Sequence, residues 1–182
     1  MIPLIPYLLS KKRRKREMLL DAKDADGAFK VQEKLNFKAS ILVVASTCDL
    51  RIKKEVPIKP GEYDIVIEYL TLKDQHEVRR LIFVSRETVP NAEPFSTEAV
   101  VDFGMVICLD KAFAETEWRG EKESDAIVAM HDSWNKGHMV YRDGVGKPRG
   151  IVVLPGTVDG RFRLKAEVNH ESQYRIELDF YS

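Results

Sequence analysis

The sequence predicts an α+β fold dominated by antiparallel β-sheet, sandwich-like or partly closed, with a helical arm at its amino end and a helical insertion. Two observations predict the sheet. Apolar and charged residues alternate with a period of two over residues 161–168 and 174–180, and β-branched apolar runs recur from residue 41 onward. A third observation, 44% hydrophobic and 32% charged residues in a chain of 182, indicates a globular body with its own core.

The amino-terminal segment, residues 1–38, is expected to be a basic and mostly helical arm, because leucines stand among strong helix formers. Six consecutive cations occupy its middle: Lys11, Lys12, Arg13, Arg14, Lys15 and Arg16. Such a run can contact phosphates, anionic lipid or an acidic partner. A solvated helix face is the preferred interpretation, since no aromatic residues interleave with the cations. Local contact with nucleic acid or a membrane is the alternative.

The remaining chain, residues 39–182, is expected to form a single β-rich domain. Residues 63–70 and 80–84 flank a polar turn and are predicted to pair as a hairpin. Gly104 interrupts an apolar stretch, which predicts a bulge, a bend or two short strands. The two alternating segments within residues 161–180 predict an amphipathic hairpin with one buried face.

Helical signals return in an insertion at about residues 111–136. Asp110 and Ser124 are each placed to cap a helix. Apolar residues recur at helical spacing in the second helix, so His131 and Trp134 fall on its apolar face.

The charge balance and the cysteines indicate the cellular compartment and limit the classes of partner. Lys and Arg balance Asp and Glu at 29 each, which argues against attraction of the whole protein to nucleic acid or membrane. Cys48 and Cys108 lie in strand-like runs and are interpreted as small buried hydrophobes. No Cys-x-x-Cys motif, secretory signal or apolar run of about 18 residues occurs, so we expect a cytoplasmic protein.

Five short motifs occur in a characteristic order: Pro60-Gly61-Glu62-Tyr63, Asp102-Phe103-Gly104, Asp110, Gly156-Thr157-Val158-Asp159-Gly160-Arg161-Phe162 and Asp179-Phe180. Together they resemble the bacterial family called domain of unknown function 4241, over about residues 40–182. The chain departs from that pattern at Val158, where the family has glycine, and at Phe162, where it has tyrosine. The resemblance implies an architecture but no reaction, because the family has no assigned common function.

The function favoured by the sequence is non-catalytic binding of a protein or a nucleotide-like ligand, as an immunity or anti-defence protein in bacterial or phage conflict. The sequence lacks the common nucleophile, phosphate-loop and zinc motifs, and its sheet has a charged outer face. Trp118, Trp134 and Tyr141, with His131, are one candidate ligand site, although core packing explains these aromatics equally well. No cofactor is expected, and the oligomeric state is left open.

The alternative function is a metal-dependent hydrolase that uses Asp102, Asp110 and Asp159 to hold the metal or to act as general acid and base. This chemistry requires the three carboxylates to converge, whereas capping and turn roles do not. No resident metal site is assigned, since no two histidines stand at a spacing that places both on one helix face.

Overall fold

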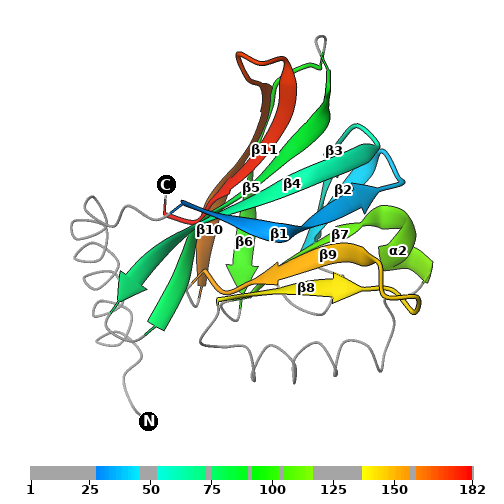
Figure 1. The fold of residues 1–182 in the computed structure, drawn as a ribbon. Helices are drawn as coiled ribbons and strands as arrows, with labels where there is room; N and C mark the ends of the chain where they lie inside the picture. Colours follow the sequence, from blue (N-terminus) through cyan, green and yellow to red (C-terminus); the bar gives the residue numbers. More distant parts are fainter. Residues whose placement is uncertain are drawn as a thin grey trace.

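The computed structural model describes residues 28–45, 53–72, 75–89, 92–102, 105–116, 137–155 and 159–181. Within these residues the chain forms two antiparallel sheets and one short helix, α2 (Lys111–Thr116) (Figure 1). The strands are β1 (Ala28–Phe37), β2 (Ile41–Ala45), β3 (Lys53–Pro57), β4 (Gly61–Leu72), β5 (Gln75–Thr88), β6 (Phe95–Asp102), β7 (Val106–Asp110), β8 (His138–Arg142), β9 (Pro148–Val153), β10 (Asp159–Val168) and β11 (Gln173–Asp179).

Sheet A has the strand order β1-β4-β5-β11-β10-β6, and sheet B has the order β3-β2-β7-β9-β8. The two predicted hairpins are confirmed as β4–β5, where Ile67 lies opposite Leu81, and β10–β11, where Leu164 lies opposite Leu178. The break expected at Gly104 separates β6 of sheet A from β7 of sheet B. The predicted β-rich class is therefore confirmed, and the body consists of two sheets.

The sheets share one hydrophobic core. Sheet A contributes one face of its strands, on which Phe37 contacts Tyr63 and Phe83 edge-on at ring-centroid distances of 5.2 and 5.9 Å. Sheet B contributes residues such as Val44 and Cys108, both buried. Burial raises the pKa of the Cys108 thiol, so this cysteine packs as an unreactive apolar group.

Sheet B is also covered on its other face, because α2 packs there. Phe113 and Ala114 of the helix join a second apolar cluster with Ile107 and Val152. A sheet buried on both faces needs apolar residues at consecutive positions. This explains why β2, the first four residues of β7 and the last three of β9 are continuous apolar runs, whereas the strands of sheet A alternate.

The helical arm expected over residues 1–38 is wrong for residues 28–37, which form β1 at the edge of sheet A. Leu35 and Phe37 enter the core, while Lys34, Asn36 and Lys38 are exposed. That alternation suits a strand with one buried face, and burial of the apolar residues outweighs local helix propensity. Residues 1–27, with the run of six cations, lie outside the described residues.

Strand β1 also joins the two sheets. Only residues 38–40 separate it from β2 of sheet B, and it lies beside β9 (Figure 1). At another junction the Val78 N–H of β5 donates to the Leu154 carbonyl, which follows β9, over 3.0 Å. At these two junctions, residues of sheet A lie directly beside residues of sheet B.

The predicted helical insertion is described only at its start, as α2. Residues 117–136, which include Trp118, His131 and Trp134, lie outside the described residues. In the described part of the chain, no helix has the length and apolar character that crossing a bilayer requires.

Candidate functional site

A cationic hollow lies where β1 of sheet A meets the turn between β8 and β9 of sheet B. It has a volume of about 290 Å³, and its lining contains four basic side chains and one acidic one: Lys34, Asn36, Lys38, Glu62, Lys147, Pro148 and Arg149. We call this set the cationic hollow. Its two walls come from segments more than a hundred residues apart in the sequence.

The β1 wall follows from strand geometry. Side chains two apart point to the same face of a strand, so Lys34, Asn36 and Lys38 share the face opposite the buried Leu35 and Phe37. At about 3.3 Å per residue, the Cα atoms of the two lysines stand roughly 13 Å apart. Two cations and an amide therefore line one side of the hollow.

The opposite wall is a turn organised by Asp143. Its carboxylate accepts hydrogen bonds from the Lys147 N–H at 2.9 Å, the Val145 N–H at 3.1 Å and the Arg149 Nε at 2.9 Å. The Lys147 N–H and then the Arg149 guanidinium hold the pKa of Asp143 below its usual range. Gly146, at a φ of 81°, allows the chain to reverse here. The turn thus fixes Lys147 and Arg149 at the hollow.

Three ammonium groups of the cationic hollow, those of Lys34, Lys38 and Lys147, form no ion pair with a carboxylate of the described residues. The other two charged side chains are already paired, Arg149 with Asp143 and Glu62 with Arg86 at 3.3 Å. Asp64 faces Lys34 across the β1–β4 pair, so we expect the positive potential to be highest near Lys38 and Lys147.

A second hollow adjoins the first and shares Glu62 with it. Its volume is about 350 Å³, and it is lined by the start of β4 and the end of β5: Lys59, Pro60, Gly61, Glu62, Tyr63, Ser85, Glu87, Thr88 and Val89. The Pro60-Gly61-Glu62-Tyr63 motif therefore forms a wall of this second hollow. Gly61 has a φ of 145°, a conformation that residues with a side chain rarely adopt.

Two hydroxyl groups in the lining of the second hollow are engaged with the backbone. The Tyr63 hydroxyl donates to the Lys59 carbonyl over 2.7 Å, and burial raises the pKa of Tyr63. The Ser85 hydroxyl donates to the Glu87 carbonyl and accepts from the Tyr174 N–H. Among the described residues, the linings of both hollows contain no histidine, cysteine or aspartate.

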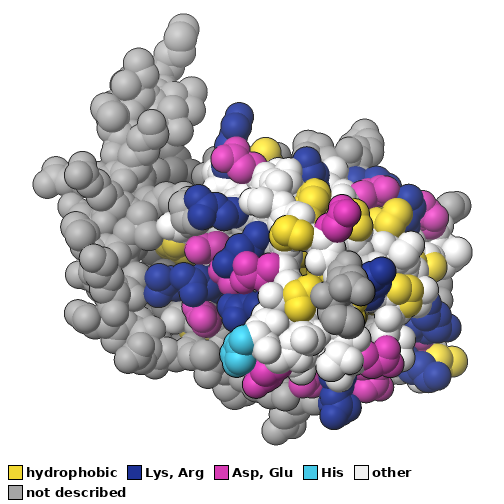
Figure 2. Space-filling model, turned by 90° about the horizontal axis from the view of Figure 1, so that it is seen from above, with side chains coloured by type: hydrophobic (Ala, Val, Ile, Leu, Met, Phe, Trp, Pro, Cys, Tyr) yellow, Lys and Arg dark blue, Asp and Glu magenta, His cyan; other side chains and the backbone are white. Residues whose placement is uncertain are grey.

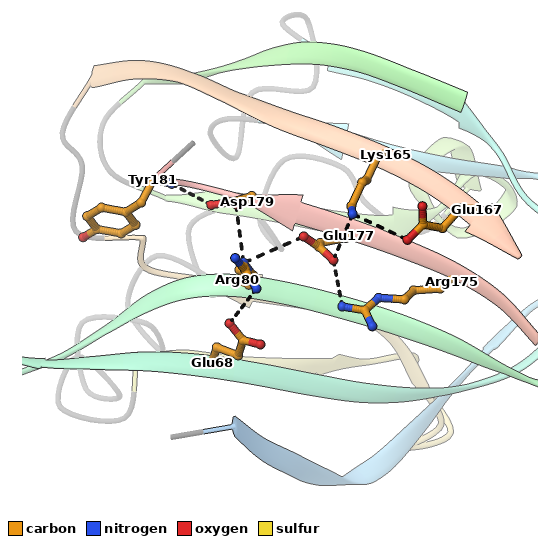
Figure 3. A network of polar contacts seen from close by, with 8 residues as sticks. All are labelled: Glu68, Arg80, Lys165, Glu167, Arg175, Glu177, Asp179 and Tyr181. Carbon is orange, nitrogen blue, oxygen red and sulfur yellow. Dashed lines mark hydrogen bonds and ion pairs between the residues drawn. The ribbon is translucent and has the colours of Figure 1, made fainter. Parts of the chain in front are cut away.

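The outer face of sheet A carries a different charge cluster, which we call the sheet A network (Figure 3). It consists of Glu68, Arg80, Lys165, Glu167, Arg175, Glu177 and Asp179, joined by ion pairs of 2.7–3.8 Å. At its centre Glu177, with a side chain only 7% exposed, contacts Arg175, Lys165 and Arg80. Basic and acidic side chains are interspersed over the side of the molecule that Figure 2 shows. Each charged side chain of the network has an opposite charge within 4 Å, while the buried Arg175 Nε has no hydrogen-bond partner among the described residues.

Asp110, a residue of the hydrolase hypothesis, has a structural position. Its side chain is 1% exposed and accepts the N–H groups of Ala112 at 2.8 Å and Phe113 at 3.3 Å, which confirms the predicted cap of α2. The other carboxylate oxygen accepts the N–H groups of Lys38 and Ala39. Asp110 thereby joins the end of β1 to sheet B, and its oxygens are already engaged.

The other two aspartates of that hypothesis lie at strand ends. Asp102 ends β6 and lies opposite Asp159, the first residue of β10. Their backbones are adjacent, but their side chains are outside the described part. Among described residues, no group of three or more His, Cys, Asp or Glu side chains could hold a metal ion.

Of the predicted aromatic site, only Tyr141 is described. It lies on β8, and its ring packs against Phe113 of α2 at a centroid distance of 5.7 Å. This contact belongs to the apolar cluster under the helix, as the core-packing interpretation expects. Trp118, His131, Trp134 and the basic run from Lys11 to Arg16 lie outside the described residues.

Comparisons with protein-family models, curated proteins and solved structures find no match for this chain.

Sequence reasoning missed the cationic hollow although its signal was present. The segment from Lys34 to Lys38 alternates polar and apolar residues over five positions, which is typical of a strand. It was instead assigned to the expected helical arm. The opposite wall follows an Asp-Gly-x-Gly turn, of which only the turn character is readable from sequence. The two walls of the cationic hollow come together because β1 lies where sheet A meets sheet B. No local sequence pattern predicts that arrangement.

Proposed function

We propose that this protein is a non-catalytic binding protein that holds a small, phosphate-bearing, nucleotide-like ligand in the cationic hollow. The observation that carries the proposal is a lining in which three lysines, Lys34, Lys38 and Lys147, form no ion pair with any described residue. A phosphate accepts charge-assisted hydrogen bonds from lysine and arginine, which are stronger than neutral ones. Hydrogen bonds from backbone N–H groups to Asp143 hold the turn that carries Lys147, so binding needs little ordering of the backbone.

The size of the hollow supports a small ligand. Its volume of about 290 Å³ lies close to the lower end of the range typical of small-molecule sites, roughly 300–1,000 Å³. The walls come from two sheets that share one core, and rigid elements of this kind hold a binding constellation well.

The wider role that we propose is that of an immunity or anti-defence protein in bacterial or phage conflict, acting in the cytoplasm by sequestering its ligand. We also propose that residues 40–182 share the architecture of the domain of unknown function 4241 family. The support is the Pro60-Gly61-Glu62-Tyr63 motif, which lines the hollow adjoining the proposed site.

Isothermal titration calorimetry of the full chain with adenosine monophosphate tests the proposal. We expect saturable binding that weakens at least about 10-fold in the double variant Lys38→Gln/Lys147→Gln, since one charge-assisted hydrogen bond contributes about 1.5–3 kcal/mol. The matched control, Lys54→Gln/Arg161→Gln, removes two cations elsewhere and should stay within about 2-fold of the parent. Absence of binding, or equal losses in both double variants, would contradict the proposal.

A further inference from the structure

The two hollows adjoin but differ in chemistry. The cationic hollow has four cations and one carboxylate in its lining, whereas the second hollow has two carboxylates, Glu62 and Glu87, one cation, Lys59, the side chain of Thr88 and two apolar side chains, Pro60 and Val89. Glu62 belongs to both linings and therefore marks their junction. A molecule that spans the junction would meet mostly cations at one end and, at the other, which we call the acceptor end, two carboxylates with one cation.

Gly61 lies beside Glu87 at the acceptor end. A Cβ atom built there would lie 4.0 Å from the Glu87 carboxylate oxygen, which places this oxygen beside the start of β4. Glu62, the next residue, is partly neutralised by Arg86, while Glu87 has no ion pair among the described residues. Glu87 is also exposed, so its oxygens are available to accept hydrogen bonds from a ligand.

The chemistry of the acceptor end argues for hydroxyl groups. A second phosphate would be disfavoured there, because two carboxylates, Glu62 and Glu87, outnumber the one cation of this lining, Lys59. A nucleobase would gain most from stacking on an aromatic face, but the aromatic residue of this lining, Tyr63, is 1% exposed and packs its ring against Phe37. Sugar hydroxyls donate hydrogen bonds to carboxylates, and a sugar ring also packs on small apolar side chains such as Pro60 and Val89.

We infer that the ligand is a phosphorylated sugar, free or as part of a nucleotide, with its phosphate in the cationic hollow and its hydroxyls bound by Glu87 in the second hollow. This inference rests on the proposed function, because it takes the phosphate site as given. Beyond the proposed function, it names the sugar hydroxyls as a recognised group. It also names Glu87 as the residue that distinguishes a sugar phosphate from inorganic phosphate.

Calorimetric titrations with inorganic phosphate, ribose 5-phosphate and adenosine monophosphate test it on the full chain. We expect ribose 5-phosphate to bind at least about 10-fold more tightly than phosphate, and Glu87→Gln to remove most of that advantage without weakening phosphate binding. The matched control is Glu93→Gln, an exposed glutamate outside both linings, which should leave all three affinities unchanged. Equal affinity for ribose 5-phosphate and the monophosphate identifies the free sugar phosphate as sufficient, and tighter monophosphate binding identifies the nucleotide as the source.

Failure of this inference and failure of the proposed function give different results. Phosphate and ribose 5-phosphate of equal affinity, both sensitive to Lys38→Gln/Lys147→Gln, would overturn the role of Glu87 and leave the anion site standing. Binding of none of the three molecules would overturn both.

Discussion

The sheet A network and the cationic hollow are built from similar side chains in opposite states of pairing. In the network, Glu177 alone contacts three cations, and Arg80 contacts three carboxylates. In the cationic hollow, three ammonium groups share a lining with one carboxylate, Glu62, which Arg86 already engages. The network has four carboxylates and three cations, each with an opposite partner, whereas the lining of the hollow has four cations and one carboxylate.

This difference indicates which charges serve the fold and which are available to a ligand. A charged group removed from water needs hydrogen-bond and ion-pair partners within the protein. Once it has them, few of its hydrogen-bonding positions are available to a ligand. An exposed lysine keeps its hydration and is free to exchange water for phosphate. The state of pairing, rather than the density of charge, therefore separates the two regions.

The largest effect that we predict concerns Asp110, the carboxylate with the most complete set of partners. Asp110→Ala leaves four backbone N–H groups without their acceptor, at the α2 cap and at the end of β1. We expect the free energy of unfolding to fall by about 3 kcal/mol in urea denaturation. A loss below about 1 kcal/mol would show that the carboxylate is not structural and would revive its catalytic interpretation.

A smaller loss is expected for the centre of the sheet A network. Glu177→Ala removes the carboxylate shared by Arg175, Lys165 and Arg80, whose side chains are about one third exposed and so can be partly rehydrated. We expect the free energy of unfolding to fall by about 2 kcal/mol, with the affinity for adenosine monophosphate unchanged.

Glu167→Ala provides the matched control for that variant. Glu167 is 48% exposed and contacts only Lys165 in the network, so its removal should change stability by no more than about 0.5 kcal/mol. If either variant weakened ligand binding about 10-fold, the network would be part of the site and the comparison between the two regions would fail.

The smallest effect concerns Asp143, which holds the turn beside the cationic hollow. Because its pKa is lowered in the folded protein, its contribution to stability is complete above the ordinary value of 3.8 and is lost as the pH falls through the folded pKa. Carboxyl NMR should therefore give an Asp143 midpoint below 3.8, with the amides of Val145 and Lys147 shifting at the same pH. A midpoint at or above 3.8 would show that these hydrogen bonds do not hold the turn in solution.

Much of the fold was readable from the sequence because its signals are local. The β10–β11 hairpin follows from strict alternation on both sides of a short turn, and the Asp110 cap follows from an aspartate ahead of a helical segment. β1 was missed for the opposite reason, since leucines and basic residues upstream favoured a helix over the whole segment. The strand is indicated only by the alternation of Leu35 and Phe37 with polar neighbours. That alternation is decisive only because both side chains enter the core of the folded protein.

The candidate site was readable only in part. Pro60-Gly61-Glu62-Tyr63 was singled out as a turn motif, and it does form the start of β4. Its place beside the two hollows depends on β5, which pairs with β4 within sheet A, and on the β8–β9 turn, which is brought near because β9 lies beside β1. Asp110 is the cap of α2, as an aspartate directly before a helix commonly is, and the convergence of Asp102, Asp110 and Asp159 stays a prediction.

The central claim is that unpaired cations, and not the denser paired ones, form the binding site. A titration of the ¹⁵N-labelled full chain with adenosine monophosphate, followed by amide chemical shifts, tests it most directly. We predict saturable shifts at residues 34–38 and 143–149, with the amides of Lys165, Arg175 and Glu177 unchanged. Shifts centred on the sheet A network, or no shifts at about 5 mM ligand, a concentration that would populate even a millimolar complex, would contradict the account.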